Sequence, residues 1–244
     1  MRNVLVTGGS RGIGLGIVRR LTEVGFRAIA VARKESSELT AALEEIEAKN
    51  AGSLRFVPFD LADIEGIADL VKTVRKEFGP IYGLVNNAGT SAEGSLGLMP
   101  ISQMERLVRL NTLSPMVVTK HVVRSMMAGG GGRVVNIASI VANTGYSGLS
   151  VYSATKASLI GFTRSLAREV GPMNVTVNAV SPGFVDTDMT KGLTEEQREQ
   201  IVRRSPLKRL AEVADVANAV EFLLSDGAKN ITGTVLTVDA GNTA

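Results

Sequence analysis

Short apolar segments alternate with longer amphipathic segments along almost the whole chain. The short segments are rich in β-branched residues and predict strands, because such residues favour a pleated and buried backbone. They lie at residues 3–7, 27–32, 53–59, 81–86, 132–138, 174–180 and 234–238. The longer segments repeat their apolar positions every three or four residues and predict helices. These helices lie at residues 12–24, 36–50, 63–78, 102–128, 152–171 and 212–225.

Several of the predicted strands are apolar on both faces, among them residues 28–32 (Ala-Ile-Ala-Val-Ala) and 134–138 (Val-Val-Asn-Ile-Ala). Such strands are typical of a parallel sheet that helices cover on both sides. The alternation of strands with helices supplies the crossover connections that a parallel sheet needs. The pattern therefore predicts an α/β fold with a doubly wound, mostly parallel, seven-stranded sheet and helices on both of its faces.

Two segments interrupt this alternation. Residues 129–132 are four consecutive glycines between a predicted helix and a predicted strand, and they indicate a loop that ends the helix. Residues 183–206 place charged, helix-forming residues such as Glu195, Glu196 and Arg198 between the last two strands. Inserted segments of this kind often form mobile lids over a cleft.

The composition is that of one globular domain. With 244 residues, of which 44% are hydrophobic and 21% charged, we expect residues 1–244 to form a single domain. The chain has no cysteine, which excludes disulfides and thiolate metal sites and favours a cytoplasmic location. We expect no signal peptide, and no apolar run approaches the roughly 20 residues that span a bilayer. The net charge of +3 comes from scattered Lys and Arg residues, which favours anionic cofactor or substrate groups over nucleic acid.

A glycine-rich loop follows the first predicted strand and opens the first predicted helix. There, backbone N–H groups and the helix dipole favour a pyrophosphate, so the loop predicts a dinucleotide site. Its spacing of Gly8, Gly12 and Gly14 differs from the common GxGxxG pattern. The residues of the expected phosphate-binding loop are Gly8, Gly9, Ser10, Arg11, Gly12, Ile13 and Gly14.

The end of the second strand indicates which dinucleotide binds. An acidic residue about 20 positions after the glycines would bind the ribose hydroxyls of NAD. The chain has Val31-Ala32-Arg33-Lys34 in this neighbourhood, so no carboxylate stands at the strand end. Arg33 and Arg11 carry guanidinium groups suited to a 2′-phosphate, and the sequence therefore favours NADP(H) over NAD(H).

Tyr152 and Lys156 lie four residues apart in a predicted helix, thirteen residues after Ser139. Residues at this spacing share one helix face, so an ammonium group can lie beside a phenol. A nearby cation lowers the pKa of a phenol from its usual value of about 10. The pair is therefore a candidate for general acid/base chemistry on a carbonyl or an alcohol.

Taken together, these motifs resemble the short-chain dehydrogenase/reductase family over essentially the whole chain. The residues that carry the resemblance are Thr7 to Gly14, Asp60, Asn86 to Gly89, Asn111, Ser139, Tyr152 to Lys156, and Pro182-Gly183. The resemblance implies a Rossmann fold and nicotinamide-dependent oxidation or reduction. It also implies that Tyr152 donates a proton to a ketone and that Ser139 hydrogen-bonds the carbonyl. Lys156 would bind the nicotinamide ribose and lower the pKa of Tyr152, and Asn111 would position a water that links Lys156 to solvent.

The same resemblance implies further cofactor contacts. Asp60 and Leu61 would lie against the adenine, and residues 87–89 would line the nucleotide cleft. Four residues after the sixth strand would lie on the nicotinamide side. By residue, these expected contacts are Asp60, Leu61, Asn87, Ala88, Gly89, Pro182, Gly183, Val185 and Thr187.

Within the family, the chain is most similar to the 3-oxoacyl-(acyl-carrier-protein) reductases of bacterial fatty-acid synthesis. Those enzymes use basic residues beside the cleft to receive the acidic carrier protein, whereas Gly130 and Met173 stand at two of the corresponding positions here. A reductase of 3-oxoacyl-CoA, or of a small ketone or sugar, would keep the same catalytic residues. Specificity would then lie in residues 91–99 and 183–204. An alternative of another class is a non-catalytic, dinucleotide-binding regulator, which would require damage at catalytic positions that are intact here.

Two further aromatic or titratable residues are not expected to be catalytic. His121, the only histidine, lies within a helix beside Val122 and Val123, and Tyr146 has no lysine four residues later. We interpret Tyr146 as a substrate-loop or packing residue. No metal site is expected, because no cluster of His, Asp and Glu has metal-ligand spacing.

The helices predicted at 102–128 and 152–171 are apolar on more than one face, which predicts a homo-oligomer. The family resemblance implies a homotetramer.

Overall fold

The protein is described here by a computed structural model that covers residues 1–187 and 194–244. Seven strands form one sheet in the order β3-β2-β1-β4-β5-β6-β7, and every neighbouring pair is parallel. The strands are β1 (Asn3–Thr7), β2 (Arg27–Ala32), β3 (Leu54–Pro58), β4 (Ile81–Asn86), β5 (Gly132–Ile137), β6 (Val175–Pro182) and β7 (Val235–Val238). The predicted doubly wound sheet is confirmed, and it is wholly rather than mostly parallel. The strand order reverses between β1 and β4, which is where such folds bind ligands.

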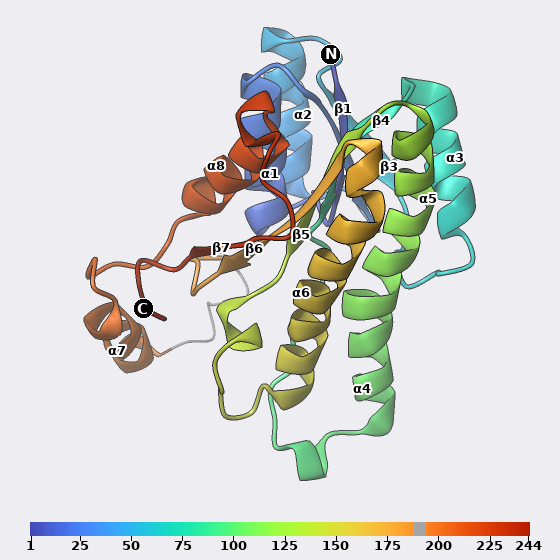
Figure 1. Cartoon of the computed structure of the whole chain (residues 1–244). Helices are drawn as coiled ribbons and strands as arrows, with labels where there is room; N and C mark the ends of the chain where they lie inside the picture. The colour runs from blue at the N-terminus through green and yellow to red at the C-terminus, as the bar shows by residue number, and fades with distance from the viewer. Residues whose placement is uncertain (188–193) are drawn as a thin grey trace.

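Helices cover the sheet on both faces, as the two-sided apolar strands predicted (Figure 1). One face carries α1 (Gly12–Glu23), α2 (Ser37–Lys49) and α8 (Val213–Leu224), whose apolar side chains share a core cluster with β1 and β2. The other face carries α3 (Ile67–Phe78), α5 (Ser114–Ala128) and α6 (Ser150–Val170), which form the second cluster. All residues of β5 and β6 are buried between these layers, so the strand ends that carry candidate chemistry are held rigidly.

The helix predicted at 102–128 has a structure that the apolar pattern did not show. It consists of α4 (Ile101–Val108), a π-helical turn (Arg109–Leu113, η2) and α5. A π-helical turn inserts one extra residue into a helix, and such turns are frequent at functional sites. Asn111 lies at its centre and is buried.

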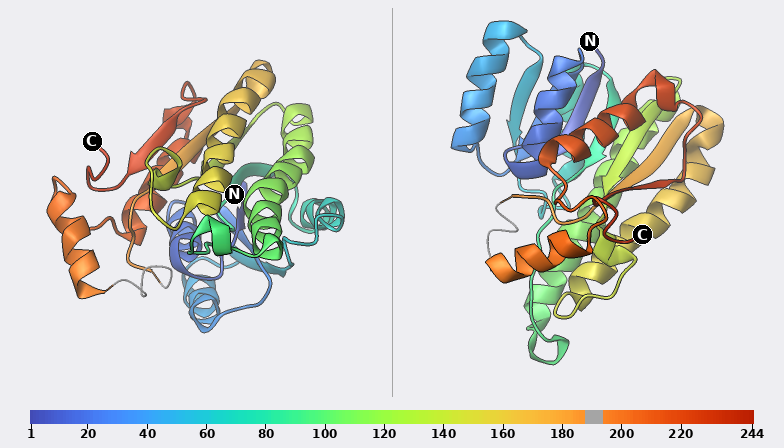
Figure 2. Two further views of the ribbon diagram at one scale, coloured as in Figure 1. Left: turned by 90° about the horizontal axis from the view of Figure 1, so that it is seen from below. Right: turned by 90° about the vertical axis from the view of Figure 1, so that its left-hand side faces the viewer.

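The inserted segment before the last strand contains α7 (Glu195–Arg204), which begins with a capping box between Thr194 and Gln197. No residue of α7 is buried, so the helix lacks the apolar stripe that identifies core helices. It lies apart from the helices that cover the two faces of the sheet (Figure 2). Residues 188–193, which include Asp188 and Met189 of the predicted specificity segment, lie outside the described residues.

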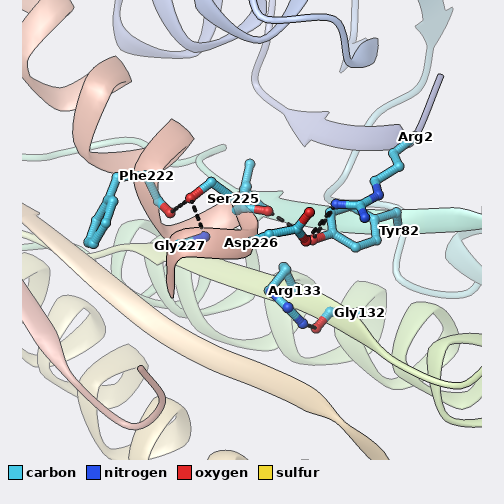
Figure 3. A network of polar contacts seen from close by, with 9 residues as sticks. Arg2, Tyr82, Gly132, Arg133, Phe222, Ser225, Asp226 and Gly227 are labelled. Carbon is cyan, nitrogen blue, oxygen red and sulfur yellow. Dashed lines mark hydrogen bonds and ion pairs between the residues drawn. The ribbon is translucent and has the colours of Figure 1, made fainter. Parts of the chain in front are cut away.

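A cluster of polar and aromatic side chains, formed by Arg2, Tyr82, Arg133 and Asp226, connects the amino-terminal edge of the sheet to the turn after α8 (Figure 3). The guanidinium of Arg2 lies 4.5 Å from the ring centroid of Tyr82 and donates to Asp226 at 2.8 Å. The buried Arg133 approaches the same ring at 5.7 Å. The Tyr82 hydroxyl donates to the carbonyl oxygen of Leu224 at 2.9 Å, so one ring connects β1, β4, β5 and the end of α8.

Among the residues that the structure describes, no helix combines the length and the apolar character that crossing a membrane requires.

Candidate active site

The glycine loop after β1 is held by the segment that follows β4. The buried hydroxyl of Thr7 accepts hydrogen bonds from the backbone N–H groups of Asn87, at 3.0 Å, and Ala88, at 3.1 Å. The Asn87 amide donates in return to the carbonyl oxygens of Thr7 and Gly8, at 3.0 and 3.1 Å. The structure thus brings the glycine loop and Asn87–Gly89 together at the carboxyl edge of the sheet, as the sequence predicted.

The first turn of α1 leaves its backbone donors without a side-chain cap. Its N-cap residue, Arg11, makes no capping hydrogen bond, and Gly8 and Gly12 hold φ angles of +68° and +54°. Gly14 lies so close to the Gly8 carbonyl and the Asn87 amide that a Cβ atom would overlap both. The helix terminus therefore lies directly against the segment after β4 and presents N–H groups and a positive dipole end, which suit a pyrophosphate.

The loop that follows β2 lies against the glycine loop. The Ser36 hydroxyl donates to the carbonyl oxygen of Ser10 at 2.5 Å. Arg33, directly after β2, and Arg11 are exposed, and within the described ranges neither forms an ion pair. Ile13 packs against the core cluster and anchors the loop. The two guanidinium groups thus belong to adjoining loops at the adenosine end of the expected site.

Asp60 and Leu61 follow β3 but have different environments. Asp60 is exposed, and its carboxylate accepts a hydrogen bond from the backbone N–H of Ala62 at 2.9 Å. The Leu61 side chain is 4% exposed and belongs to the core cluster under α3. An adenine contact by Leu61 would therefore use its backbone, and both contacts remain predictions.

Ser139, Tyr152 and Lys156 meet in the structure. Ser139 lies two residues after the end of β5 and caps the short helix η3 (Ile140–Ala142). Its side chain lies close enough to Tyr152, in the first turn of α6, to act on the pKa of the phenol. Lys156 lies one turn further, 5% exposed, and its Nζ donates to the carbonyl oxygen of Ile137 at 2.8 Å. This Nζ is 5.8 Å from the centroid of the Tyr152 ring.

Burial, rather than the lysine, dominates the electrostatics of this cluster. Burial raises the pKa of Tyr152 to about 12, and the nearby Ser139 side chain opposes that rise. Burial lowers the pKa of Lys156 to about 8. That Lys156 lowers the pKa of Tyr152 stays a prediction, since its Nζ donates to the carbonyl oxygen of Ile137 and lies 5.8 Å from the centroid of the Tyr152 ring. Tyr152 is a protonated acid at neutral pH, and Lys156 is a buried cation that is easily deprotonated.

The Asn111 side chain is fully engaged as a donor. Its Nδ2 donates to the carbonyl oxygen of Thr90 at 2.8 Å and to the Thr155 hydroxyl at 3.1 Å. Its Oδ1 accepts from the Thr90 backbone N–H at 2.9 Å. A Cβ atom on Gly89 would lie 3.2 Å from this oxygen and 3.5 Å from Lys156 Nζ, so Asn111 and the lysine flank the same glycine. The amide ties the π-helical turn to α6 and to the segment after β4, and its role in holding a water remains a prediction.

A chain of buried hydrogen bonds between amide and hydroxyl side chains, called the relay here, connects β4 and β5 to the helices beside the site. The Nδ2 of Asn86 donates to the Thr119 hydroxyl and to Asn136 Oδ1, both at 2.8 Å. Asn136 in turn donates to the Thr163 hydroxyl at 2.8 Å. The relay crosses β4 and β5 and connects α5 to α6. Asn86 Oδ1 is buried and has no hydrogen-bond partner among the described residues. The three hydrogen bonds of the relay still link the strand ends to the helices on that face.

The segment after β6 lies beside β7 and reaches the start of α1. The backbone of Gly183 donates to the carbonyl oxygen of Val238 at 2.9 Å, and its Cβ position is 2.6 Å from Asp239 Cβ. Val185 pairs with Ala211 in an isolated bridge. The methyl group of Thr187 comes within 3.8 Å of a Cβ position on Gly12, at the start of α1. The predicted nicotinamide-side residues, with Pro182 at the end of β6, thus reach from the sheet to the glycine loop.

His121 and Tyr146 occupy different places. His121 lies with Lys72, Arg75 and Arg124 in a groove of about 410 Å³ between α3 and α5, away from the cluster just described. Tyr146 lies in the segment between Ser139 and Tyr152 and packs against Phe184. Within residues 1–187 and 194–244, no group of three or more His, Asp or Glu side chains is arranged to hold a metal ion.

Comparison with known proteins places this arrangement in a family. A family profile described as enoyl-(acyl carrier protein) reductase matches residues 8–243. A 3-oxoacyl-(acyl-carrier-protein) reductase of Haemophilus influenzae, FabG, is 40% identical over 237 residues, covering 97% of this chain and 96% of that protein. The FabG protein of Staphylococcus aureus is 36% identical over 240 residues, covering 98% of this chain and 97% of its own. A solved short-chain type dehydrogenase/reductase from Mycobacterium ulcerans superimposes with a TM-score of 0.93 at 36% identity, covering 99% of this chain and 89% of that one.

The chain belongs to the short-chain dehydrogenase/reductase family. A solved short-chain alcohol dehydrogenase described as putative, from Sinorhizobium meliloti, also superimposes with a TM-score of 0.93 at 30% identity, covering 99% of this chain and 96% of that one. Members of the family are oxidoreductases that use a nicotinamide dinucleotide. The residues of this short-chain dehydrogenase/reductase fit such a cofactor. The uncapped start of α1 and the close approach of Gly14 to Asn87 suit a pyrophosphate, and the buried Lys156 cation lies beside Gly89, two residues further.

Three supporting groups of this short-chain dehydrogenase/reductase were missed by sequence reasoning. Thr155 links Asn111 to α6, and its hydroxyl also donates to the carbonyl oxygen of Tyr152 at 2.7 Å. Ile137 supplies the acceptor for Lys156, and Ser36 joins the β2 loop to the glycine loop. Thr155 lies within the Tyr152–Lys156 motif, and its hydroxyl on a buried helix face was a sequence signal that could have predicted a structural hydrogen bond. The other two contacts join residues 19 and 26 positions apart and depend on packing alone.

Proposed function

We propose that the protein reduces the ketone of a 3-oxoacyl thioester on acyl carrier protein to the 3-hydroxyacyl form, with NADPH as reductant, in fatty-acid synthesis. The observation that carries this proposal is the meeting of Ser139 and Tyr152 beside the buried Lys156, whose Nζ lies 5.8 Å from the centroid of the Tyr152 ring. The names and high coverage of relatives that are about 40% identical support the substrate class. Residues 1–244 would act as a single NADP(H)-binding domain.

Ketone reduction requires a hydride at the carbonyl carbon and a proton at the carbonyl oxygen. Bound NADPH would supply the hydride. The Ser139 hydroxyl would hydrogen-bond the carbonyl oxygen and hold the ketone in place. Tyr152 is protonated at neutral pH, and its hydroxyl would transfer its proton to that oxygen as negative charge develops there. The Lys156 ammonium would stabilise the resulting tyrosinate, which then regains a proton from solvent, and Asn111 would hold a water on that path.

The preference for NADPH is supported by the residues around Arg33. Within the described ranges, Arg33 and Arg11 have no acidic partner that would occupy them. Glu35, the carboxylate nearest to Arg33 in sequence, accepts a hydrogen bond from the Thr40 hydroxyl at 2.8 Å and so faces α2. A 2′-phosphate would therefore meet guanidinium groups at the end of β2.

A second candidate substrate is a 3-oxoacyl-CoA, and a specific observation favours it. Neither Gly130 nor Met173 carries a charge for an acidic carrier protein. Gly130 holds a φ of +88° with open space around it, and Met173 packs against the core cluster under α6. The thioester chemistry is the same in both cases, so the two candidates differ only in the carrier.

The decisive experiment follows NADPH oxidation with acetoacetyl-acyl carrier protein, acetoacetyl-CoA and a panel of small ketones, for the wild type and for Tyr152→Phe. We expect the wild type to favour a thioester and Tyr152→Phe to lose roughly 100-fold or more in kcat. NADPH binding, followed by nucleotide fluorescence, should persist in the variant because the fold and the glycine loop are unchanged. Unchanged turnover in Tyr152→Phe would remove the tyrosine from its role, and turnover of small ketones alone would reject the thioester.

We further propose that the protein forms a homotetramer. Leu98, Ile101 and Val108 are 86%, 73% and 47% exposed along the projecting arm formed by η1 (Leu96–Leu98) and α4. On α6, Ala154 and Gly161 are exposed small residues that permit close approach of another helix. Burial of these surfaces between subunits would remove apolar area from water. A stable monomer in light scattering at micromolar concentration would contradict the proposal.

A further inference from the structure

Tyr146 is the aromatic residue beside the catalytic cluster that the proposed chemistry does not use. The chain has three tyrosines and no tryptophan, and Tyr146 lies six residues before Tyr152. Its ring is 45% exposed, yet it packs against Phe184 with ring centroids 5.9 Å apart and an interplanar angle of 54°. Such tilted pairs are stabilised beyond their buried area. Within the described residues the Tyr146 hydroxyl has no hydrogen-bond partner, so the residue contributes apolar ring surface to the rim.

The segment that carries Tyr146 is fixed at both ends. On one side, Thr144 donates from its backbone N–H to the carbonyl oxygen of Ile140 at 3.1 Å, just after the candidate catalytic Ser139. On the other, Leu149 donates to the carbonyl oxygen of Tyr146 itself at 3.2 Å, which closes a turn before α6. Tyr146 therefore stands on a short bridge between Ser139 and the helix that bears Tyr152.

This bridge also contacts the loop after β4. The backbone N–H of Gly94 donates to the carbonyl oxygen of Gly148 at 3.0 Å. Residues 91–99 are one of the two segments in which the sequence placed specificity. The hydrogen bond joins this segment to the Tyr146 turn, so the turn connects one specificity segment to the catalytic residues.

Phe184 brings in the second specificity segment. It directly follows Gly183, whose Cβ position lies 3.7 Å from the side chain of Ile140, next to Ser139. The Tyr146–Phe184 pair therefore spans from the α6 side of the cleft to the β6 side, close to where Ser139 would hold the ketone oxygen. A polar group in this place would favour water, whereas two rings favour an alkyl group.

We propose that Tyr146 and Phe184 form an apolar wall that packs against the alkyl group on the substrate ketone, and that Tyr146 thereby determines which chain lengths are reduced. The inference rests on the proposed reduction of 3-oxoacyl thioesters and adds which residues select the substrate. Tyr146 is a specificity-determining residue, and it takes no part in proton transfer. One methylene in an apolar pocket changes discrimination by about 10- to 200-fold, so loss of a whole ring on one wall is a measurable change.

The test compares Tyr146→Ala with the matched variant Tyr146→Phe. Both are assayed with NADPH and 3-oxoacyl-CoA thioesters of increasing chain length, and in parallel with methyl ketones of increasing alkyl length. We expect Tyr146→Ala to raise KM for short-chain substrates roughly tenfold or more, with a smaller change in kcat and a shift of the preferred length towards longer chains. Tyr146→Phe should restore the wild-type order, because the ring rather than the hydroxyl forms the wall. The dissociation constant for NADPH should stay unchanged in both variants.

Phe184→Ala tests the proposed apolar wall independently of Tyr146. If the rings act as one wall, Phe184→Ala should shift the chain-length order in the same direction, and the double variant should lose less than the product of the single losses. The inference is overturned if Tyr146→Ala lowers kcat/KM by one factor for every chain length, if it weakens NADPH binding, or if Tyr146→Phe fails to restore the order. A wild type that reduces the ketones but no thioester would reject the proposed function, and the ketone series would still test the wall.

Discussion

The hydroxyl of Thr155 accepts a hydrogen bond from the side-chain amide of Asn111 at 3.1 Å. Asn111 lies on the π-helical turn and Thr155 lies between the two candidate catalytic residues of α6. The same hydroxyl donates to the carbonyl oxygen of Tyr152 at 2.7 Å. One hydroxyl thus connects the irregular turn of one helix to the first turn of the next, where the proton donor is held.

Thr155→Val should therefore reduce turnover without unfolding the protein. Valine has the shape of threonine but leaves the Asn111 amide with a buried donor that has no partner, which costs about 1–3 kcal/mol. We expect kcat for ketone reduction to fall about tenfold through misplacement of Tyr152 and the π-helical turn. Thr155→Ser keeps the hydroxyl and is the matched control. Unchanged turnover in Thr155→Val together with a loss in Thr155→Ser would show that packing of the methyl group matters, and that the hydrogen bond does not.

Lys156→Met should make the protein more stable and less active. Burial lowers the pKa of Lys156 from 10.5 to about 8, so the folded state holds this proton less tightly than the unfolded state. Below about pH 8 the penalty of the buried ammonium is fully present. Between about pH 8 and 10.5 the unfolded chain binds more protons, so the contribution of this lysine to stability rises with pH. Methionine removes the penalty at neutral pH, although it also removes the hydrogen bond to Ile137.

Thermal unfolding of the two proteins between pH 7 and 9.5 measures this effect. We expect Tm of Lys156→Met to exceed that of the wild type by a few degrees at pH 7, and the gap to narrow as the pH rises. Turnover should be lost because no cation remains to stabilise the tyrosinate. A variant that is less stable than the wild type at pH 7 would mean that the hydrogen bond to Ile137 outweighs the desolvation of the ammonium.

Arg33→Asp should reverse the preference between the two dinucleotides. Loss of a charge-assisted hydrogen bond and the approach of a carboxylate to the 2′-phosphate should raise KM for NADPH about 10- to 100-fold. KM for NADH should change little or fall, because aspartate can accept from the ribose hydroxyls. Lys34→Asp, an exposed neighbour with the same charge change, is the control. If Lys34→Asp produced the same ratio of KM values, the effect would come from the general field of the surface.

Much of the fold could be predicted because strand and helix signals here are local. The ranges of β1, β2 and β4 match those predicted, and the other strands differ only by a residue or two at their ends. The π-helical turn at Asn111 was not predictable, because one extra residue hardly disturbs an apolar repeat. α7 was missed as an element because no side chain in it is buried. Its capping box, Thr194 with Gln197, was the local signal that could have found it.

In the candidate site too, features set by neighbouring residues in the sequence could be predicted, and features set by tertiary packing could not. The order of Ser139, Tyr152 and Lys156 along the chain identified the cluster, since the spacing of a helix and a strand end is local. The raised pKa of Tyr152 could not be predicted from the sequence, because it depends on how deeply the side chain is buried. The helical spacing of Tyr152 and Lys156 places both on one face, but the ammonium takes the carbonyl oxygen of Ile137, 19 residues earlier in the chain.

Tyr82 should contribute more to stability than the ion pair beside it at the amino-terminal edge of the sheet. Tyr82→Phe removes the hydrogen bond to the Leu224 carbonyl but keeps the ring between Arg2 and Arg133, and we expect a loss of about 1 kcal/mol. Tyr82→Leu also removes the ring face from the buried Arg133 and should cost more. Asp226→Asn breaks an ion pair whose side chains are 49% and 72% exposed, so solvent screening should make its effect the smallest of the three.

Urea unfolding of the three variants gives the order of their losses in the free energy of unfolding. Their kcat should stay unchanged, because the Tyr82 ring lies at the opposite edge of the sheet from Tyr152. If Asp226→Asn lowered the free energy of unfolding more than Tyr82→Phe, the ion pair would be the main stabilising interaction of this cluster.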